Sequence, residues 1–167
     1  MSNQIITQME QVTPLWLTSV LLSSGALIRG AVASFNVIPG GGNWSANALL
    51  NLRYIDGSEG TLPQRLFLKM VNTNMNGEFF DPSEVFYYTR DYIGVPGAPL
   101  VRCYDAAYSE KLHRYHILLD DLSETHVMAA DKTPTLEYGL ALAEGLAAMH
   151  ARWWGAQRFS ELGATIH

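Results

Sequence analysis

The apolar residues in the middle of the chain recur mostly at every second position, which is the period of a strand that shows its side chains alternately to two faces. Glycine, proline, asparagine, aspartate and serine interrupt this alternation at intervals, as they do at turns. The pattern predicts five strands, over residues 31–38, 46–55, 63–71, 100–106 and 115–119. The glycine-rich residues 39–45 join the first two strands into a hairpin.

Helical patterns flank and interrupt these strands. A Thr-Pro pair, typical of a helix start, precedes a periodic run over residues 15–23, and Thr133-Pro134 begins a long apolar run that ends before Gly155. Asp81-Pro82-Ser83-Glu84 opens a further helix that extends to about Tyr92. Because the strand signals stop near residue 120, we expect an α+β protein, with a β-rich domain over residues 1–120 and a helical part over 121–167.

Composition and charge narrow the class of protein. Of the 167 residues, 48% are hydrophobic and 16% are charged, which is enough apolar material for a sizeable core. The net charge is −5 and no cluster of Lys or Arg occurs. Since binding to a phosphate backbone draws its affinity from clustered cations, nucleic acid is not an expected partner.

Three further features bear on location. Cys103 is the only cysteine, so no internal disulfide can form. The first residues lack the basic and apolar regions of a signal peptide, and no segment is long and apolar enough to span a bilayer. The sequence therefore predicts a cytoplasmic protein that has no membrane partner.

One lysine stands out in the predicted strand over residues 63–71. Alternation puts Lys69 on the same face as Phe67 and Val71, and both faces of this strand carry apolar residues. An unpaired buried ammonium costs several kcal/mol, so Lys69 should reach water or meet an anion supplied by the protein or by a ligand. Alternatively, it is an edge-strand lysine that prevents aggregation.

Two neighbouring features allow more than one interpretation. The glycine loop lies between two strands, which excludes a dinucleotide-binding or P-loop site, but a glycine-rich hairpin can place backbone N–H groups over a triphosphate as well as form a simple turn. Glu84 lies three residues after Asp81 and could complete a capping box. It could instead point back at the sheet and pair with Lys69.

Other polar and aromatic residues favour structural roles. His113 and His116 should face opposite sides of a strand and so cannot share a metal; we expect them at the surface or near a hinge. Successive side chains diverge, so Asp120 and Asp121 predict a solvated connector and not a metal site. On the long helix we expect His150 to be packed, and Trp153 and Trp154 to belong to the core.

Taken in order, the glycine hairpin, the strand lysine, the helix glutamate, two strands and an acidic connector resemble the N-terminal part of the aminoglycoside phosphotransferase and choline kinase-like superfamily, most closely its ecdysteroid kinase-like branch. The stretches that carry the resemblance cover nearly the whole chain: PLWLTSVL, GGGNWSANALLNLRY, LPQRLFLKM, SEVFYYTRDY, APLVRCYDAAY, RYHILLDDLSETH and LALAEGLAAMHARWW.

The resemblance implies a protein-kinase-like small lobe with a five-stranded antiparallel sheet and a helix over residues 1–120. It further implies that residues 121–167 hold the hinge and the first helices of an incomplete, truncated large lobe. Lys69 would contact the ATP phosphates and Glu84 would hold Lys69. The backbone of the glycine loop would cover the nucleotide, and the main chain of the connector would meet adenine. The loop residues concerned are Gly41, Gly42, Asn43 and Ser45, and the connector residues are Asp120, Asp121 and Leu122.

The sequence departs from the family at the catalytic loop. The family places its acceptor base in a His-x-Asp motif and its Mg²⁺ ligands after it, but no histidine of this chain is followed two residues later by aspartate. We therefore expect the nucleotide-binding part of an ATP- and Mg²⁺-dependent phosphotransferase acting on a small-molecule alcohol, with no catalytic residue and no metal ligand in these residues. The alternative is a non-catalytic nucleotide-binding or scaffold module. The apolar helix over residues 134–154 predicts self-association.

Overall fold

The computed structural model describes residues 4–41, 45–71, 81–98 and 100–155. It shows an α+β fold around a five-stranded antiparallel sheet in the order β2-β3-β5-β7-β6, built from the five strands that the alternation predicts. The strands of this sheet are β2 (Val32–Gly40), β3 (Ala46–Tyr54), β5 (Arg65–Val71), β6 (Cys103–Ser109) and β7 (Arg114–Asp120). A separate two-stranded sheet consists of β1 (Leu27–Arg29) and β4 (Glu59–Gly60).

Most helices are short. They are the 3₁₀ turn η1 (Met9–Gln11), helix α1 (Pro14–Ser23), helix α2 (Ser83–Phe86), which continues as the π-helical segment η2 (Tyr87–Asp91), the 3₁₀ turn η3 (Ala129–Asp131) and helix α3 (Leu136–Trp153). Helix α1 begins as predicted, with Pro14 at its first position and the Thr13 hydroxyl accepting the Trp16 N–H.

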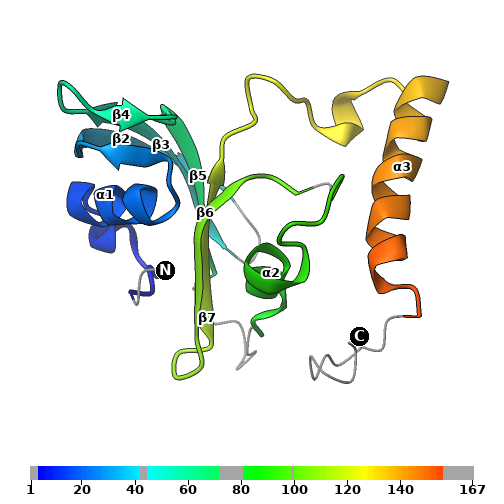
Figure 1. Cartoon of the computed structure of the whole chain (residues 1–167), viewed down its shortest axis with the longest axis horizontal. Coiled ribbons are helices and arrows are strands. Elements are labelled where there is room, and N and C mark those ends of the chain that lie inside the picture. Colours follow the sequence, from blue (N-terminus) through cyan, green and yellow to red (C-terminus); the bar gives the residue numbers. More distant parts are fainter. Residues whose placement is uncertain (1–3, 42–44, 72–80, 99, 156–167) are drawn as a thin grey trace. The chain divides into compact units, whose positions relative to one another are not determined.

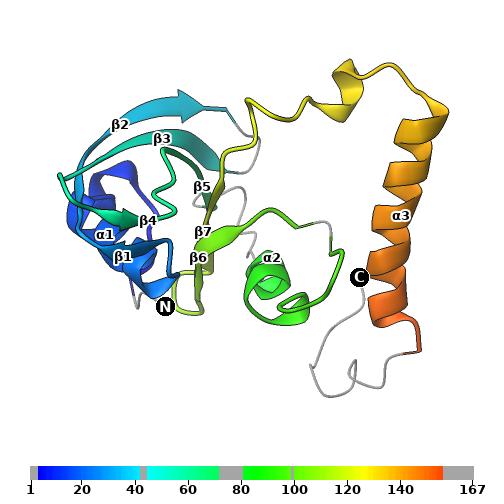
Figure 2. The same cartoon turned by 45° about the horizontal axis from the view of Figure 1, so that its top comes forward.

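One face of the five-stranded sheet is closed by the N-terminal part of the chain. Leu66, Leu68 and Met70 of β5 point into this side and are at most 2% exposed. They pack with the apolar residues of α1, of which Leu17 and Leu21 are fully buried. In Figure 1 the sheet is seen nearly edge-on, with α1 on one side and α2 on the other, and Figure 2 shows the same arrangement. This face therefore forms the main core and is closed to ligands.

The other face is only partly covered. Around Val85, α2 packs on Val71, Tyr115 and Ile117, at the end of the sheet formed by β6 and β7. The residues of β2 and β3 that share this face are exposed or half-buried. Although apolar residues occur on both faces of β5, Phe67 and Lys69 on this side are therefore only half-buried. Within the described residues, α2 thus leaves the half of this face formed by β2 and β3 uncovered.

A buried histidine fastens the N-terminal segment to the sheet. His116 is 0% exposed, which corrects the expectation of a surface or hinge histidine. Its Nδ1 accepts the Ile6 N–H at 3.1 Å, and its Nε2 lies 3.1 Å from the Asp105 carboxylate. Because Nδ1 accepts, Nε2 carries the proton and donates to Asp105. This pairing joins three segments that are distant in sequence, and no local pattern could predict it.

Strand β6 begins three residues later than predicted and extends to Ser109. A bulge between Cys103 and Asp105 interrupts its pairing with β7 and turns the Asp105 carboxylate toward His116. Asp105, a polar residue within the predicted strand, is thus a buried partner of His116. The small β1–β4 sheet was not predicted, since each strand is too short to show a period. It depends on Gly60, whose φ is +135° and where a Cβ would lie 2.3 Å from the Ala26 carbonyl oxygen.

Backbone contacts divide the chain into two compact units, residues 1–93 with 101–126 and residues 94–100 with 127–167. In the second unit, α3 is capped by the hydroxyl of Thr135 and not by Thr133 as the Thr-Pro pair predicts. None of its residues is buried. The expectation of packed side chains is wrong for His150, which is exposed, and for Trp154, which is 86% exposed; Trp153 is half-buried. An amphipathic period identifies an apolar stripe but not what covers it.

None of the helices within the described ranges combines the length and hydropathy that crossing a bilayer requires.

Candidate functional site

Lys69 occupies the central strand of the sheet, β5, on its partly open face. Its ammonium donates to both oxygens of the Glu84 carboxylate, at 2.8 and 2.7 Å. The two side chains are 28% and 31% exposed, so the pair is neither solvated nor sealed from ligands. A central strand excludes the edge-strand interpretation of Lys69. The lysine is a cation held in place by protein and still accessible from outside.

The two interpretations of Glu84 are distinguished by the start of α2. The Asp81 carboxylate accepts the Ser83 N–H at 2.8 Å, so a residue before the helix satisfies this first-turn donor. Glu84 does not return to the cap, because both its oxygens face Lys69. The structure therefore favours the pair with Lys69 over the capping box.

A third side chain contacts the pair. Tyr115 of β7 is 7% exposed and donates its hydroxyl to Glu84 Oε2. Burial first, and then this hydrogen bond to a carboxylate, raise the pKa of Tyr115 above its usual value, so the hydroxyl keeps its proton and remains a donor. Tyr115 was predicted only as the first residue of a strand. Alternation in β7 could have predicted that Tyr115 lies on the same face of the sheet as Lys69, but it could not have predicted the contact with Glu84.

An apolar row crosses the sheet next to Lys69. Strand register places five residues side by side on the open face, one from each strand: Ile38, Leu49, Phe67, Leu119 and Cys103. Ile38 is 49% exposed and the other four are half-buried. A flat apolar strip beside a paired lysine offers a ligand both a surface for a ring and a charge for an anion.

The glycine loop begins at the same face. Asn47 is the cross-strand neighbour of Lys69, and its side-chain amide donates to the Gly41 carbonyl at 3.1 Å. The Ser45 hydroxyl donates to Asn47 Oδ1 at 2.9 Å. The Asn47 side chain of β3 therefore hydrogen-bonds to Gly41 and to Ser45, the described residues at the two ends of the glycine loop. Gly42 and Asn43, two of the predicted loop residues, lie outside the described residues.

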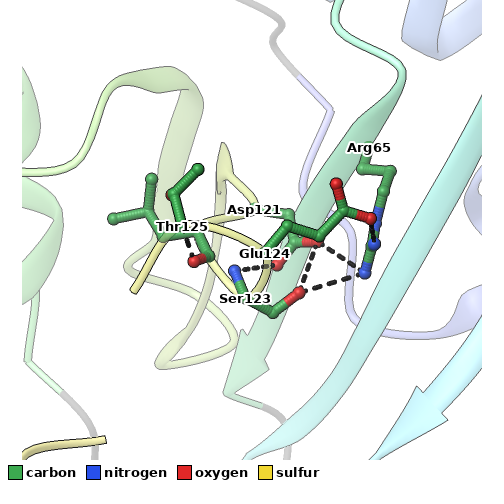
Figure 3. A network of polar contacts seen from close by, with 6 residues as sticks. Arg65, Asp121, Ser123, Glu124 and Thr125 are labelled. Carbon is green, nitrogen blue, oxygen red and sulfur yellow. Dashed lines mark hydrogen bonds and ion pairs between the residues drawn. The ribbon is translucent and has the colours of Figure 1, made fainter. Parts of the chain in front are cut away.

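The connector after β7 is held on the opposite side of the apolar row. Arg65, at the start of β5, donates to the Asp121 carboxylate at 2.8 Å and to the Ser123 hydroxyl at 3.0 Å, and also pairs with Glu124 (Figure 3). The Asp121 side chain is only 5% exposed, which corrects the expectation of a solvated aspartate. An arginine four residues before Lys69 gave no recognisable sequence signal for this contact.

Neighbouring groups of the connector are also engaged. The Asp120 N–H donates to the Arg102 carbonyl at 3.0 Å, and its carboxylate accepts the Tyr104 hydroxyl. The Leu122 carbonyl accepts the N–H groups of Thr125 and His126 at 3.1 and 2.9 Å. These bonds form a compact turn, so the predicted hinge is an ordered segment fixed to the sheet.

In the part of the chain that the structure describes, no group of three or more His, Cys, Asp or Glu side chains gathers in a way that could hold a metal ion. A cavity of about 230 Å³ lies away from Lys69, between the end of α1, η2 and β6. Cys103 and Tyr88 line it, and burial followed by the charge of Asp105 raises the pKa of Cys103 to about 12, so its thiol is a poor nucleophile. We assign no chemistry to this cavity.

Comparisons of the chain with protein-family models, with curated proteins and with solved structures found no match. The site therefore has to be interpreted from its own geometry.

Proposed function

We propose that this chain binds ATP and forms the nucleotide side of a phosphotransferase that transfers the γ-phosphoryl group to an alcohol. The observation that carries the proposal is the Lys69–Glu84 pair on the open face of the central strand. An ion pair with a purely structural role could be fully buried. A lysine that binds phosphate must instead point in a fixed direction and remain accessible to the ligand. Glu84 supplies the direction, and the 28% exposure of Lys69 supplies the access.

The remaining features of this face fit the parts of a nucleotide. The apolar row through Leu49 and Phe67 would contact adenine, next to the main chain of the Asp120–Leu122 connector. The glycine loop that Asn47 links to this face would lie over the phosphates. A nucleotide would then lie along β5, with its base toward Arg65 and its triphosphate toward Lys69. This arrangement also agrees with the kinase-like small lobe that the sequence resembles.

We assign only nucleotide binding to residues of this chain. An ATP-dependent transfer also uses Mg²⁺ to bridge the phosphates and an aspartate to orient the acceptor hydroxyl. Among the described residues no group of three or more His, Cys, Asp or Glu side chains gathers, and the sequence has no His-x-Asp motif, so we assign neither role to a residue of this chain. The identity of the alcohol is likewise left unassigned.

The same observation favours a second candidate, a nucleotide-binding module without catalysis. Both candidates require ATP to bind at Lys69. Because we assign no catalytic residue to this chain, binding without product is expected of both. Incubation of the chain with ATP, Mg²⁺ and a panel of alcohols therefore tests for transfer alone, and phosphorylated product that depends on Lys69 would favour the transferase over the module.

Substitution of Lys69 tests the proposal directly. We expect Lys69→Met to weaken ATP binding at least tenfold, or about 1.4 kcal/mol, because methionine keeps the apolar stem but cannot contact a phosphate. Titration calorimetry measures the affinity, and circular dichroism checks that the fold is intact. The matched control is Lys111→Met, which removes an exposed lysine from the β6–β7 turn. Equal ATP affinity in the wild type and in both variants would show that Lys69 is not a nucleotide ligand.

A further inference from the structure

The anchoring of Glu84 raises a structural question. The α-helical part of α2 is only four residues long and continues as a π-helical segment, so helix stability alone cannot fix the direction of a side chain. The contacts of α2 with the sheet are few and centre on Val85. The carboxylate must therefore be held through its own hydrogen bonds, from Lys69 and from Tyr115.

The two donors are not equivalent. Lys69 ends in a freely rotating ammonium on a flexible stem and is 28% exposed. Tyr115 is a rigid ring, 7% exposed and fixed on β7, and its neighbour across the pairing is Val71 of β5. A hydroxyl in this position cannot turn to water and needs its acceptor. Tyr115 therefore holds the Glu84 carboxylate in a fixed position, whereas the Lys69 side chain can move when a ligand binds.

We propose that Tyr115 is a positioning residue for the nucleotide site: its hydroxyl holds the Glu84 carboxylate against the sheet, and Glu84 in turn directs the Lys69 ammonium toward the open face. This inference rests on the proposed function for the ligand, but the three-residue contact is independent of it. Tyr115 touches no nucleotide itself. It acts through Glu84, so its effect must disappear when Glu84 is absent.

The chain offers a close control. Tyr108 of β6 pairs with Tyr115 across the strands and belongs to the same apolar cluster, but its hydroxyl contacts His113 Nδ1 at 3.1 Å and not Glu84. Tyr108→Phe and Tyr115→Phe remove the same atom from adjacent positions. A general loss of packing or polarity would affect both variants alike.

The test combines two measurements on the full chain. For Tyr115→Phe we expect ATP affinity to fall about tenfold in the wild-type background and to be unchanged in the Glu84→Ala background, because a removed acceptor leaves nothing to position. Without nucleotide, we expect the same variant to speed amide hydrogen exchange within residues 83–91 at least fivefold. Tyr108→Phe should change neither quantity.

Each outcome decides one point. If Tyr115→Phe leaves exchange in residues 83–91 unchanged, or lowers ATP affinity equally with and without Glu84, the positioning role is overturned. If the wild-type chain binds no ATP, the proposed function fails, and the exchange measurement still decides whether Tyr115 anchors Glu84.

Discussion

Glu84 accepts hydrogen bonds from Lys69 and Tyr115, so removal of its charge leaves a half-buried ammonium without a counter-charge. We expect Glu84→Gln to lower the free energy of unfolding by about 1 kcal/mol, a modest value because water still reaches both partners of the pair. Urea denaturation measures the difference. Glu59→Gln is the control, since Glu59 pairs with Arg29 at an exposed position and its loss should stay within about 0.5 kcal/mol. Equal effects of the two substitutions would contradict a special role for Glu84.

The environment of Cys103 makes a second prediction for a single residue. Burial and the nearby Asp105 carboxylate raise the pKa of its thiol from 9.0 to about 12. The thiolate fraction at pH 8 should therefore be roughly a thousandfold below that of a free cysteine, a factor of ten for each pKa unit. Labelling with a chromogenic disulfide reagent should be slow in the native protein and fast in urea. Rapid labelling of the native chain would contradict the raised pKa of this thiol.

Among the secondary-structure elements, β5 and the connector after β7 depend on each other through Arg65. We expect Arg65→Ala to leave the Asp121 carboxylate buried without its cation, which costs about 2 kcal/mol, and to speed exchange of the amides of Ser123, Thr125 and His126. Hydrogen exchange followed by NMR measures both effects.

Arg65→Lys serves as the comparison for that prediction. Lysine keeps the charge but lacks the planar fork that lets Arg65 contact Asp121, Ser123 and Glu124 together, so it should rescue only part of the protection. Full protection in Arg65→Ala would show that the turn at Leu122 holds the connector without the arginine.

For the molecule as a whole, the apolar residues of α3 predict association between copies of the chain. Leu136, Leu140 and Leu146 are 80%, 56% and 47% exposed, and contiguous apolar surface of this kind usually marks a contact site. Light scattering should show dimers or larger species at micromolar concentration, and Leu140→Glu with Leu146→Glu should give monomers. The control is Glu137→Gln on the same helix, and a monomeric wild-type chain would contradict the prediction.

Much of the fold could be predicted from local patterns. Alternation identified the five strands of the main sheet, because an apolar period of two is imposed by the pleat itself. The Thr-Pro pair also predicted the start of α1. Lys69 and Glu84 could be selected as candidate residues, because a charged residue is unusual within a short apolar segment. The pairing of Lys69 with Glu84 was one of two open alternatives. The contacts of the Glu84 carboxylate, whose two oxygens both accept from Lys69, decided between them.

Tertiary structure decided the features that depend on residues distant in sequence. Asp105 with His116, Arg65 with Asp121, and Glu84 with Tyr115 are brought together by strand order and by a bulge, neither of which leaves a local period. The sequence by itself determined which segments are strands and helices and where the unusual charges lie, because these follow from near-neighbour sterics and polarity. Which faces are closed, and which polar groups meet across them, followed only from packing, because burial is a property of the assembled sheet and not of any single segment.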